Sequence, residues 1–253
     1  MSAPGIVPFL MAGDGGLERT LEVLFALDAA DGGPPAAVEL GIPFTDPVAD
    51  GPVLQAAAGR ALSAGTTPDG VLELARDYRR AGGTTTLYCF SYANPLVGRG
   101  AQDGAARLQE AGFDGAMIPD LPLEEWRPFA EALVECGLAP IPFCAPTTSR
   151  RRLAAMLELG RGFLYAIARL GTTGSATQLS PGLMRRLDEL HHLSPLPVGI
   201  GFGLRTRSEV EALAGHVDLA IVGSALVDAI HNAGPSTARA AEAARHFLTQ
   251  LRS

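Results

Sequence analysis

Short apolar runs alternate with longer amphipathic stretches along the 253 residues of this chain. Residues 17–29 show the amphipathic pattern clearly, because apolar side chains recur at positions 17, 21, 24, 25 and 27, a spacing typical of a helix. The apolar runs are short, as expected of strands that are buried on both faces in a parallel sheet. We predict strands at residues 6–11, 36–41, 85–90, 116–118, 138–144, 162–168, 197–201 and 217–222.

Helices are predicted in the intervals between these strands. Pro52 suits a first helical turn, Ser149 is a good N-cap and Gly112 is a natural C-cap. The predicted helices cover residues 17–29, 52–64, 69–80, 102–111, 123–135, 149–159, 182–190, 205–214, 224–231 and 237–251. Eight strand–helix units in about 250 residues favour an α/β fold, a closed (β/α)8 TIM barrel, over an open sheet. We see no composition break, and we therefore expect a single domain over residues 1–253.

The composition argues against several kinds of partner. The net charge of −7 disfavours binding to nucleic acid. No apolar run reaches the ~20 residues of a membrane span, and the first residues lack the basic start and apolar core of a signal peptide. Three cysteines without metal-type spacing indicate reduced thiols. We therefore expect a cytoplasmic protein with neither a membrane nor a nucleic-acid partner.

All 20 basic residues are arginines, and the absence of lysine limits the available chemistry. Schiff-base catalysis on a substrate carbonyl needs a lysine amine, and so does a covalently held pyridoxal phosphate. Both are excluded for this chain. The five histidines fall on predicted helices or on loops opposite the strand ends that carry the chemistry, which disfavours metal-dependent aldol chemistry. We predict no metal site, although carboxylates alone are able to hold magnesium.

In a barrel of this kind the active site lies at the carboxyl ends of the strands. Glu39 is the first candidate there, because a carboxylate between Val38 and Leu40 is expensive to bury unless it is used or paired. Asp50 lies in the loop that follows the same strand. The other candidates at strand ends are Tyr92, Asn94, Asp120, Thr147, Tyr165, Arg169, Thr173 and Gly174. For Asp120 taken alone, a turn-forming or helix-capping role is the more common one.

Glycine-rich turns follow the last three strands. Gly201-Phe202-Gly203 and Gly223-Ser224 occupy the two loops that commonly bind phosphate in this fold, where backbone N–H groups at the start of a short helix can face an anion. Residues 171–174, Gly-Thr-Thr-Gly, fit a lid with glycine hinges and fit a surface loop equally well.

The stretch VELGIPFTDPVADGP at residues 38–52 resembles the signature of the tryptophan synthase α subunit family. Shorter motifs follow in the order of that family: SYANP at 91–95, PDLPLEE at 119–125, APTTS at 145–149, GTTG at 171–174, GFGLR at 201–205 and VGSA at 222–225. The resemblance implies a (β/α)8 barrel that cleaves indole-3-glycerol phosphate to indole and glyceraldehyde 3-phosphate. It also implies a lyase of tryptophan biosynthesis that has no cofactor of its own.

The resemblance assigns roles to individual residues. Glu39 matches the catalytic glutamate of the family, and Asp50 matches its aspartate. The cleavage needs a proton at indole C3 and a base for the glycerol hydroxyl, and a buried Glu39 with a raised pKa can supply both in turn. Asp50 is expected to accept the indole N–H, and Thr173 to bond Asp50 when the lid closes. The implied substrate contacts are Phe9, Phe90, Tyr92, Tyr165, Thr173 and Phe202, and the implied phosphate contacts are Gly174, Gly203, Gly223 and Ser224.

The chain departs from the family pattern in two places. The family normally has an amphipathic helix before the first strand, whereas about five residues precede Ile6 here. The lid reads Gly-Thr-Thr-Gly instead of the usual Gly-Val-Thr-Gly, and Ala168 replaces a common serine. The first departure concerns the bottom of the barrel, and the second concerns lid closure.

The resemblance implies one protein partner, a tryptophan synthase β subunit that holds pyridoxal phosphate. The matching contact positions are Asp46-Pro47, Asn94-Pro95-Leu96 and Pro122. Three alternatives stay open: a stand-alone indole-releasing lyase, an inactive barrel kept as an allosteric partner, and a different phosphosugar enzyme on the same fold. Retention of Glu39 and Asp50 argues against the inactive barrel, and the length of the match at 38–52 argues against the other enzyme.

Overall fold

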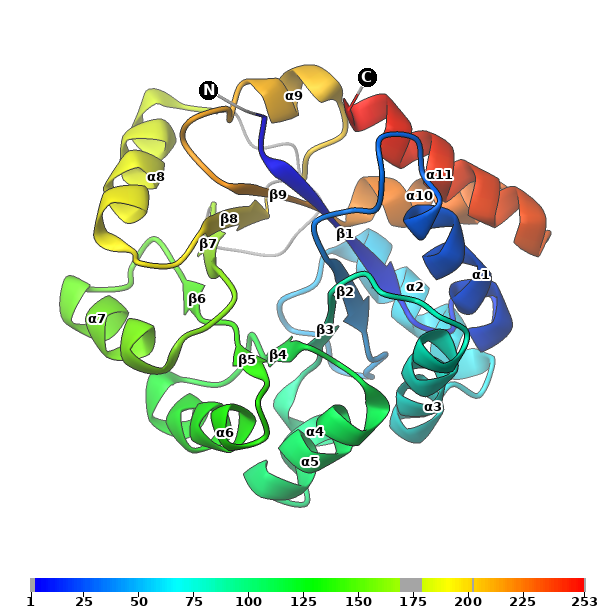
Figure 1. Ribbon diagram of the computed structural model, residues 1–253, viewed down its shortest axis with the longest axis horizontal. Coiled ribbons are helices and arrows are strands. Elements are labelled where there is room, and N and C mark those ends of the chain that lie inside the picture. Colours follow the sequence, from blue (N-terminus) through cyan, green and yellow to red (C-terminus); the bar gives the residue numbers. More distant parts are fainter. Residues whose placement is uncertain (1–2, 169–178, 202, 253) are drawn as a thin grey trace.

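The computed structural model describes residues 3–168, 179–201 and 203–252, in which the strands form one parallel sheet that curls into a barrel (Figure 1). The strand order in the sheet is β5-β4-β3-β2-β1-β9-β8-β7-β6. The strands are β1 (Gly5–Met11), β2 (Val38–Gly41), β3 (Leu87–Phe90), β4 (Gly115–Met117), β5 (Ala139–Pro140), β6 (Phe143–Cys144), β7 (Leu164–Ile167), β8 (Val198–Gly201) and β9 (Leu219–Val222). The predicted (β/α)8 barrel is confirmed, with its fifth strand divided into β5 and β6.

The division of the fifth strand corrects the prediction of one continuous strand at 138–144. Pro140 and Pro142 have no N–H to donate to a ladder, so regular pairing is interrupted between them. The segment still joins both of its neighbours. Ile141 donates its N–H to a carbonyl of β4 at 3.0 Å, and Tyr165 of β7 donates its N–H to the Pro142 carbonyl at 2.9 Å. These bonds close the barrel between β4 and β7.

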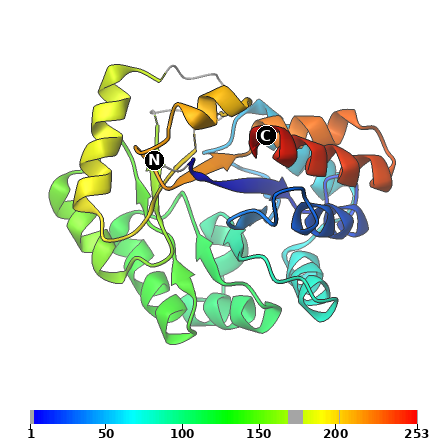
Figure 2. The same cartoon turned by 45° about the horizontal axis from the view of Figure 1, so that its top comes forward.

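The helices lie around the outside of the barrel (Figures 1 and 2). They are α1 (Leu17–Asp28), α2 (Pro52–Ser63), α3 (Pro68–Arg80), α4 (Ala93–Val97), α5 (Ala101–Ala111), α6 (Leu123–Glu135), α7 (Arg150–Leu159), α8 (Pro181–Leu193), α9 (Arg207–Glu211), α10 (Ser224–Asn232) and α11 (Thr237–Arg252). The Ser149 hydroxyl accepts the Arg152 N–H, and Gly112 ends α5 with a φ of 83°, as the sequence predicted for these caps.

The helix predictions were wrong in two places. No helix was predicted between residues 90 and 102, but α4 begins at Ala93, and Pro95 fits its first turn because an N–H there has no helical partner. The helix expected at 205–214 ends at Glu211. After Glu211 the helical hydrogen bonds give way to a turn, in which Leu213 donates its N–H to the Val210 carbonyl three residues earlier. Ala214 then forms an isolated β-bridge with Val217.

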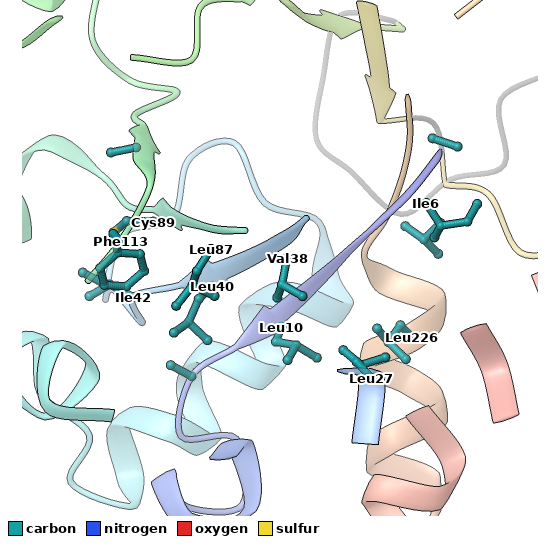
Figure 3. Close-up of a cluster of buried hydrophobic side chains, with 14 of the residues drawn as sticks. Ile6, Leu10, Leu27, Val38, Leu40, Ile42, Leu87, Cys89, Phe113 and Leu226 are labelled. Carbon is teal, nitrogen blue, oxygen red and sulfur yellow. The ribbon is translucent and has the colours of Figure 1, made fainter. Parts of the chain in front are cut away.

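Alternation along the strands separates an outer core from the inside of the barrel. Val38 and Leu40 of β2 point outward and belong to the large apolar cluster that includes Leu10, Leu27 and Leu226 (Figure 3). Successive strand residues face opposite sides, so Glu39 points into the barrel. A second apolar cluster fills the inside, and it includes Val7, Met117, Ile141, Phe163 and Ile221.

At the start of the chain, Ala3 and Pro4 are the described residues before β1, and they form no helix. None of the helices in the described ranges has the length and apolar character that crossing a membrane requires.

Candidate active site

Glu39 lies at the centre of the candidate site. In the register of the sheet it stands between Phe9 of β1 and Tyr88 of β3. Its side chain is only 1% exposed, and its Oε1 has no hydrogen-bond partner among the described residues. Burial without a compensating cation raises the pKa of Glu39 from 4.5 to about 8. The carboxyl is therefore protonated at neutral pH and can act as an acid.

Asp50 is the second buried carboxyl, and its surroundings differ. It is 2% exposed, in the loop between β2 and α2, with its N–H bonded to the Pro47 carbonyl at 3.0 Å. Burial raises the pKa of Asp50 from 3.8 to about 6, while a hydrogen bond from the Tyr92 hydroxyl lowers it. The same hydroxyl accepts the Ala49 N–H at 3.1 Å. Asp50 is therefore mostly ionised at neutral pH, when Glu39 is protonated.

Tyr165 of β7 lies near both carboxyls. Burial is the main reason that the pKa of Tyr165 lies well above its usual value, and the negative charges of Glu39 and Asp50 add to it. The phenol fits because residue 201 on the neighbouring strand is glycine. A Cβ at Gly201 would stand 2.3 Å from the Tyr165 hydroxyl oxygen. Tyr165 thus lies within electrostatic range of both carboxyls.

Aromatic rings line the barrel beside Glu39. Phe9 and Phe90 pack edge to face, with ring centroids 5.5 Å apart. Phe90 in turn lies 6.4 Å from Phe143, and Phe143 lies 4.8 Å from Tyr165. The sequence predicted Phe9, Phe90 and Tyr165 but missed Phe143. Phe143 lies two residues after Ile141, and in a strand two such residues face the same side, which here is the inside of the barrel. The prolines on either side of Ile141 obscured this alternation in the sequence.

The predicted phosphate residues in the described ranges lie together at the ends of two adjacent strands. Gly203 follows β8 and Gly223 follows β9, and these strands pair directly. Gly223 also begins α10, since its carbonyl accepts the Val227 N–H at 3.0 Å. The first N–H groups of α10, beginning with Ser224, therefore have no acceptor within the helix. Such a helix start is suited to holding an anion.

Several predicted residues do not contribute to this cluster. Asp120 caps α4, because its Oδ1 accepts the Ala93 N–H at 2.9 Å. Asn94 and Thr147 are exposed. The predicted residues Arg169, Thr173, Gly174 and Phe202, and with them the lid at 171–174, lie outside the described residues. Among the residues that the structure describes, no group of three or more His, Cys, Asp or Glu side chains is placed to hold a metal ion.

The site as a whole joins two buried carboxyls of unequal acidity, an apolar aromatic wall and an anion-binding helix start. A protonated Glu39 can donate a proton, and an ionised Asp50 can accept a hydrogen bond or stabilise positive charge. Two carboxyls held in opposite protonation states are a recurring arrangement for acid–base chemistry near neutral pH. The arrangement suits an aromatic substrate that carries a phosphate.

Comparison with known proteins gives one consistent result. The family model described as tryptophan synthase alpha chain matches residues 2–252. The tryptophan synthase alpha chain of Bordetella bronchiseptica is 38% identical over 232 residues, which cover 92% of this chain and 80% of that one. The corresponding chain of Burkholderia pseudomallei is 37% identical over 249 residues, covering 98% and 90%.

Solved structures agree with this result. A chain from the tryptophan synthase α2β2 complex of Pyrococcus furiosus superposes with a TM-score of 0.88 at 31% identity, and the match covers 100% of this chain and 99% of that one. A mutant α subunit from the same organism gives a TM-score of 0.87 at 30% identity, with the same coverage. The family model accounts for nearly every residue and the fold agrees throughout, and so this chain belongs to the tryptophan synthase alpha chain family.

Proposed function

We propose that this chain is a carbon–carbon lyase that cleaves indole-3-glycerol phosphate to indole and glyceraldehyde 3-phosphate, as the α subunit of tryptophan synthase. The observation that carries this proposal is the pair of buried carboxyls, Glu39 and Asp50, which burial drives to different pKa values of about 8 and about 6. Membership of the tryptophan synthase alpha chain family supports the choice of substrate.

Glu39 is proposed to move both protons of the reaction. Its carboxylic acid first donates a proton to indole C3, which makes the ring a leaving group. The resulting Glu39 carboxylate then takes the proton of the adjacent glycerol hydroxyl. As the hydroxyl becomes an aldehyde, the bond between indole C3 and the glycerol carbon breaks, and its electron pair returns to the indole ring. Glu39 ends the cycle protonated, so no other proton donor is needed.

Asp50 is proposed to hold the indole nitrogen. When C3 is protonated, positive charge develops at the ring nitrogen, and a carboxylate that accepts the N–H stabilises that charge. The hydrogen bond from Tyr92 keeps Asp50 ionised in spite of its burial. Thr173 is proposed to bond Asp50 when the lid over the site closes.

The rest of the site is proposed to bind the two ends of the substrate. Phe9, Phe90, Tyr92, Tyr165 and Phe202 form the indole pocket, for which the edge-to-face contact of Phe9 with Phe90 gives a preformed apolar wall. Backbone groups at Gly174, Gly203, Gly223 and Ser224 bind the phosphate. The start of α10 supports this placement, because its first N–H groups have no partner within the helix.

We propose that this chain works with a tryptophan synthase β subunit in the cytoplasm. The related Pyrococcus furiosus chain was solved within an α2β2 complex, which supports such a partner. The α reaction of this family uses no cofactor, and pyridoxal phosphate belongs to the β subunit. We further propose that residues 1–253 form one domain, since the barrel and its helices run from Gly5 to Arg252.

Indole release by the purified chain tests the function. We expect Glu39→Gln to abolish cleavage with the fold retained, and Asp50→Asn to lower kcat by roughly 10²–10³-fold. Glu131→Gln is the matched control, because Glu131 is exposed on α6, and it should leave the rate unchanged. Near-normal turnover by the Glu39→Gln enzyme would contradict the proposed mechanism.

A further inference from the structure

In the described part of the chain, two buried side-chain polar atoms have no hydrogen-bond partner. One is Oε1 of Glu39, for which the proposed reaction gives a role. The other is Nε of Arg19, in the first turn of α1, which that reaction does not use. Arg19 is 7% exposed, and burial of a guanidinium costs free energy unless its N–H groups are paired or hydrogen-bonded.

The two terminal nitrogens of Arg19 hold the end of another helix. Nη2 donates to the Ile230 carbonyl at 2.6 Å, and Nη1 donates to the Gly234 carbonyl at 2.8 Å. The Ile230 carbonyl belongs to the last turn of α10, where helical carbonyls lack partners within the helix. The amides that follow bond on either side of it, Ala233 to Ala229 and Gly234 to His231. Arg19 thus satisfies this carbonyl and places a positive charge at the negative end of the α10 dipole.

The opposite end of α10 forms part of the proposed phosphate site. The helix has nine residues and so extends for roughly 13 Å. A Cβ at Gly223 would lie 3.6 Å from Cβ of Phe9, which sets the start of α10 beside the strand that neighbours Glu39. A short helix moves as a rigid unit, and a shift of its carboxyl end therefore tilts the N–H groups at its amino end.

A small cavity lies beside Arg19 and α10. Its volume is about 20 Å³, and its lining includes Asp14, Arg19, Thr20, Val227 and Ile230. That space is enough for one water molecule. Asp14, which also lines the cavity, connects this region to the loop of Asp50. Its carboxylate pairs with Arg60 of α2 at 2.6 Å, and α2 begins two residues after Asp50.

We propose that Arg19 is a positioning residue, which clamps the carboxyl end of α10 through its two terminal nitrogens, so that the amino end of α10 is aimed at the substrate phosphate. This inference rests on the proposed function, because it assigns a support for the phosphate end of that site. Arg19 itself does not touch the substrate. Its loss should therefore weaken the binding of the phosphate and leave the proton transfers at Glu39 intact.

Arg252 is a matched control for a merely structural role. It lies at the end of α11, and its two terminal nitrogens also donate to a pair of backbone carbonyls, those of Gly33 and Pro34. Removing Arg252 takes away the same kind of clamp from the loop that precedes β2, at the opposite end of that strand from the loop that carries Asp50. A general loss of stability should affect the Arg19 and Arg252 variants alike.

The test measures phosphate binding and kinetics in the full-length chain. Inorganic phosphate is titrated by calorimetry, and indole release gives kcat and KM for indole-3-glycerol phosphate. We expect Arg19→Met to raise the phosphate Kd and the KM by roughly tenfold, with kcat within about threefold of wild type. Arg19→Lys retains a cation that can reach one carbonyl, and it should restore part of the affinity. Arg252→Met should leave the phosphate Kd, KM and kcat within about twofold of wild type.

Three outcomes would overturn the inference. These are an Arg19→Met chain with a normal phosphate Kd, an equal loss of affinity in Arg19→Met and Arg252→Met, and a wild-type chain that does not bind phosphate. If Arg19→Met does not fold, the phosphate Kd of Arg19→Lys against that of wild type decides the question. An inactive wild-type chain that binds phosphate, with an affinity that falls in Arg19→Met but not in Arg252→Met, would refute the proposed reaction and leave the clamp in place.

Discussion

The Tyr92 hydroxyl stands between the backbone and the carboxylate of the same loop. It accepts the Ala49 N–H at 3.1 Å and donates to Asp50, the next residue in the chain. Because the hydroxyl oxygen already accepts a backbone N–H, its own proton is directed at the Asp50 carboxylate. The hydrogen bond from Tyr92 therefore lowers the pKa of Asp50, which burial raises. The pKa of Asp50 in turn sets the lowest pH at which Asp50 is ionised while Glu39 is protonated.

This relationship predicts the pH profile of kcat/KM. Asp50 must be ionised and Glu39 protonated, so the profile should rise near pH 6 and fall near pH 8. Tyr92→Phe removes the hydrogen bond that lowers the pKa of Asp50, and the rising limb should move to higher pH. Tyr88→Phe removes a hydroxyl from β3, the strand that precedes Tyr92, without changing the hydrogen bond to Asp50, and it should leave that limb in place. A rising limb that Tyr92→Phe does not shift would refute the assignment of Asp50.

The buried Glu39 also predicts how stability depends on pH. Its pKa is about 8 in the folded chain against 4.5 ordinarily, so between these values the folded state keeps a proton that the unfolded state has released. The free energy of unfolding should therefore decrease as the pH rises through this window. Glu39→Gln removes the dependence, and its stability relative to wild type should increase from pH 5 to pH 8 by on the order of 3 kcal/mol.

Urea unfolding of both proteins at pH 5 and pH 8 measures this change. Glu131→Gln again serves as the control, since Glu131 is exposed and its replacement should give the same difference from wild type at both pH values. If the advantage of Glu39→Gln is equal at pH 5 and pH 8, Glu39 does not hold its proton in the folded chain.

Gly201 predicts a steric effect on the site. An added Cβ would lie 2.3 Å from the hydroxyl oxygen of Tyr165 and 2.9 Å from its Cζ, so the phenol must shift from its present position. We expect Gly201→Ala to lower kcat/KM by roughly tenfold or more through misplacement of Tyr165. Gly59→Ala is the control, because a Cβ there meets nothing within 4 Å and should stabilise α2. Wild-type kcat/KM in Gly201→Ala would show that Tyr165 has no positional role.

The sequence was sufficient to find Glu39 for a clear physical reason. A carboxylate between two apolar residues of a strand must face the other side of the sheet from them, and the structure has Val38 and Leu40 in the outer core and Glu39 inside. The position of Asp50 followed in the same way from its place in the loop after that strand. Local pattern was enough in both cases, because the strand and its loop fix where these side chains go.

Other features depend on contacts that no local pattern contains. Phe143 lies in a run with two prolines, and its place between Phe90 and Tyr165 follows only from closure of the barrel. Arg19 holds a carbonyl 211 positions away, at Ile230, and its amphipathic helix gave no sign of this. The unequal pKa values of Glu39 and Asp50 likewise arise from burial and from Tyr92, which the folded chain alone brings together.

The loop before Asp50 predicts how a β subunit acts on this chain. Val48 is 72% exposed, stands two residues before the buried Asp50 and directly follows Asp46-Pro47, one of the β-subunit contact positions that the family resemblance implies. We expect the chain alone to release indole slowly and a β subunit to accelerate it by roughly 5–150-fold, through closure of this loop. Val48→Ser should reduce the stimulation and leave the basal rate unchanged, whereas Leu193→Ser, at the exposed end of α8, should change neither. Full activity without a β subunit and no measurable binding to one would instead identify a lyase that works alone.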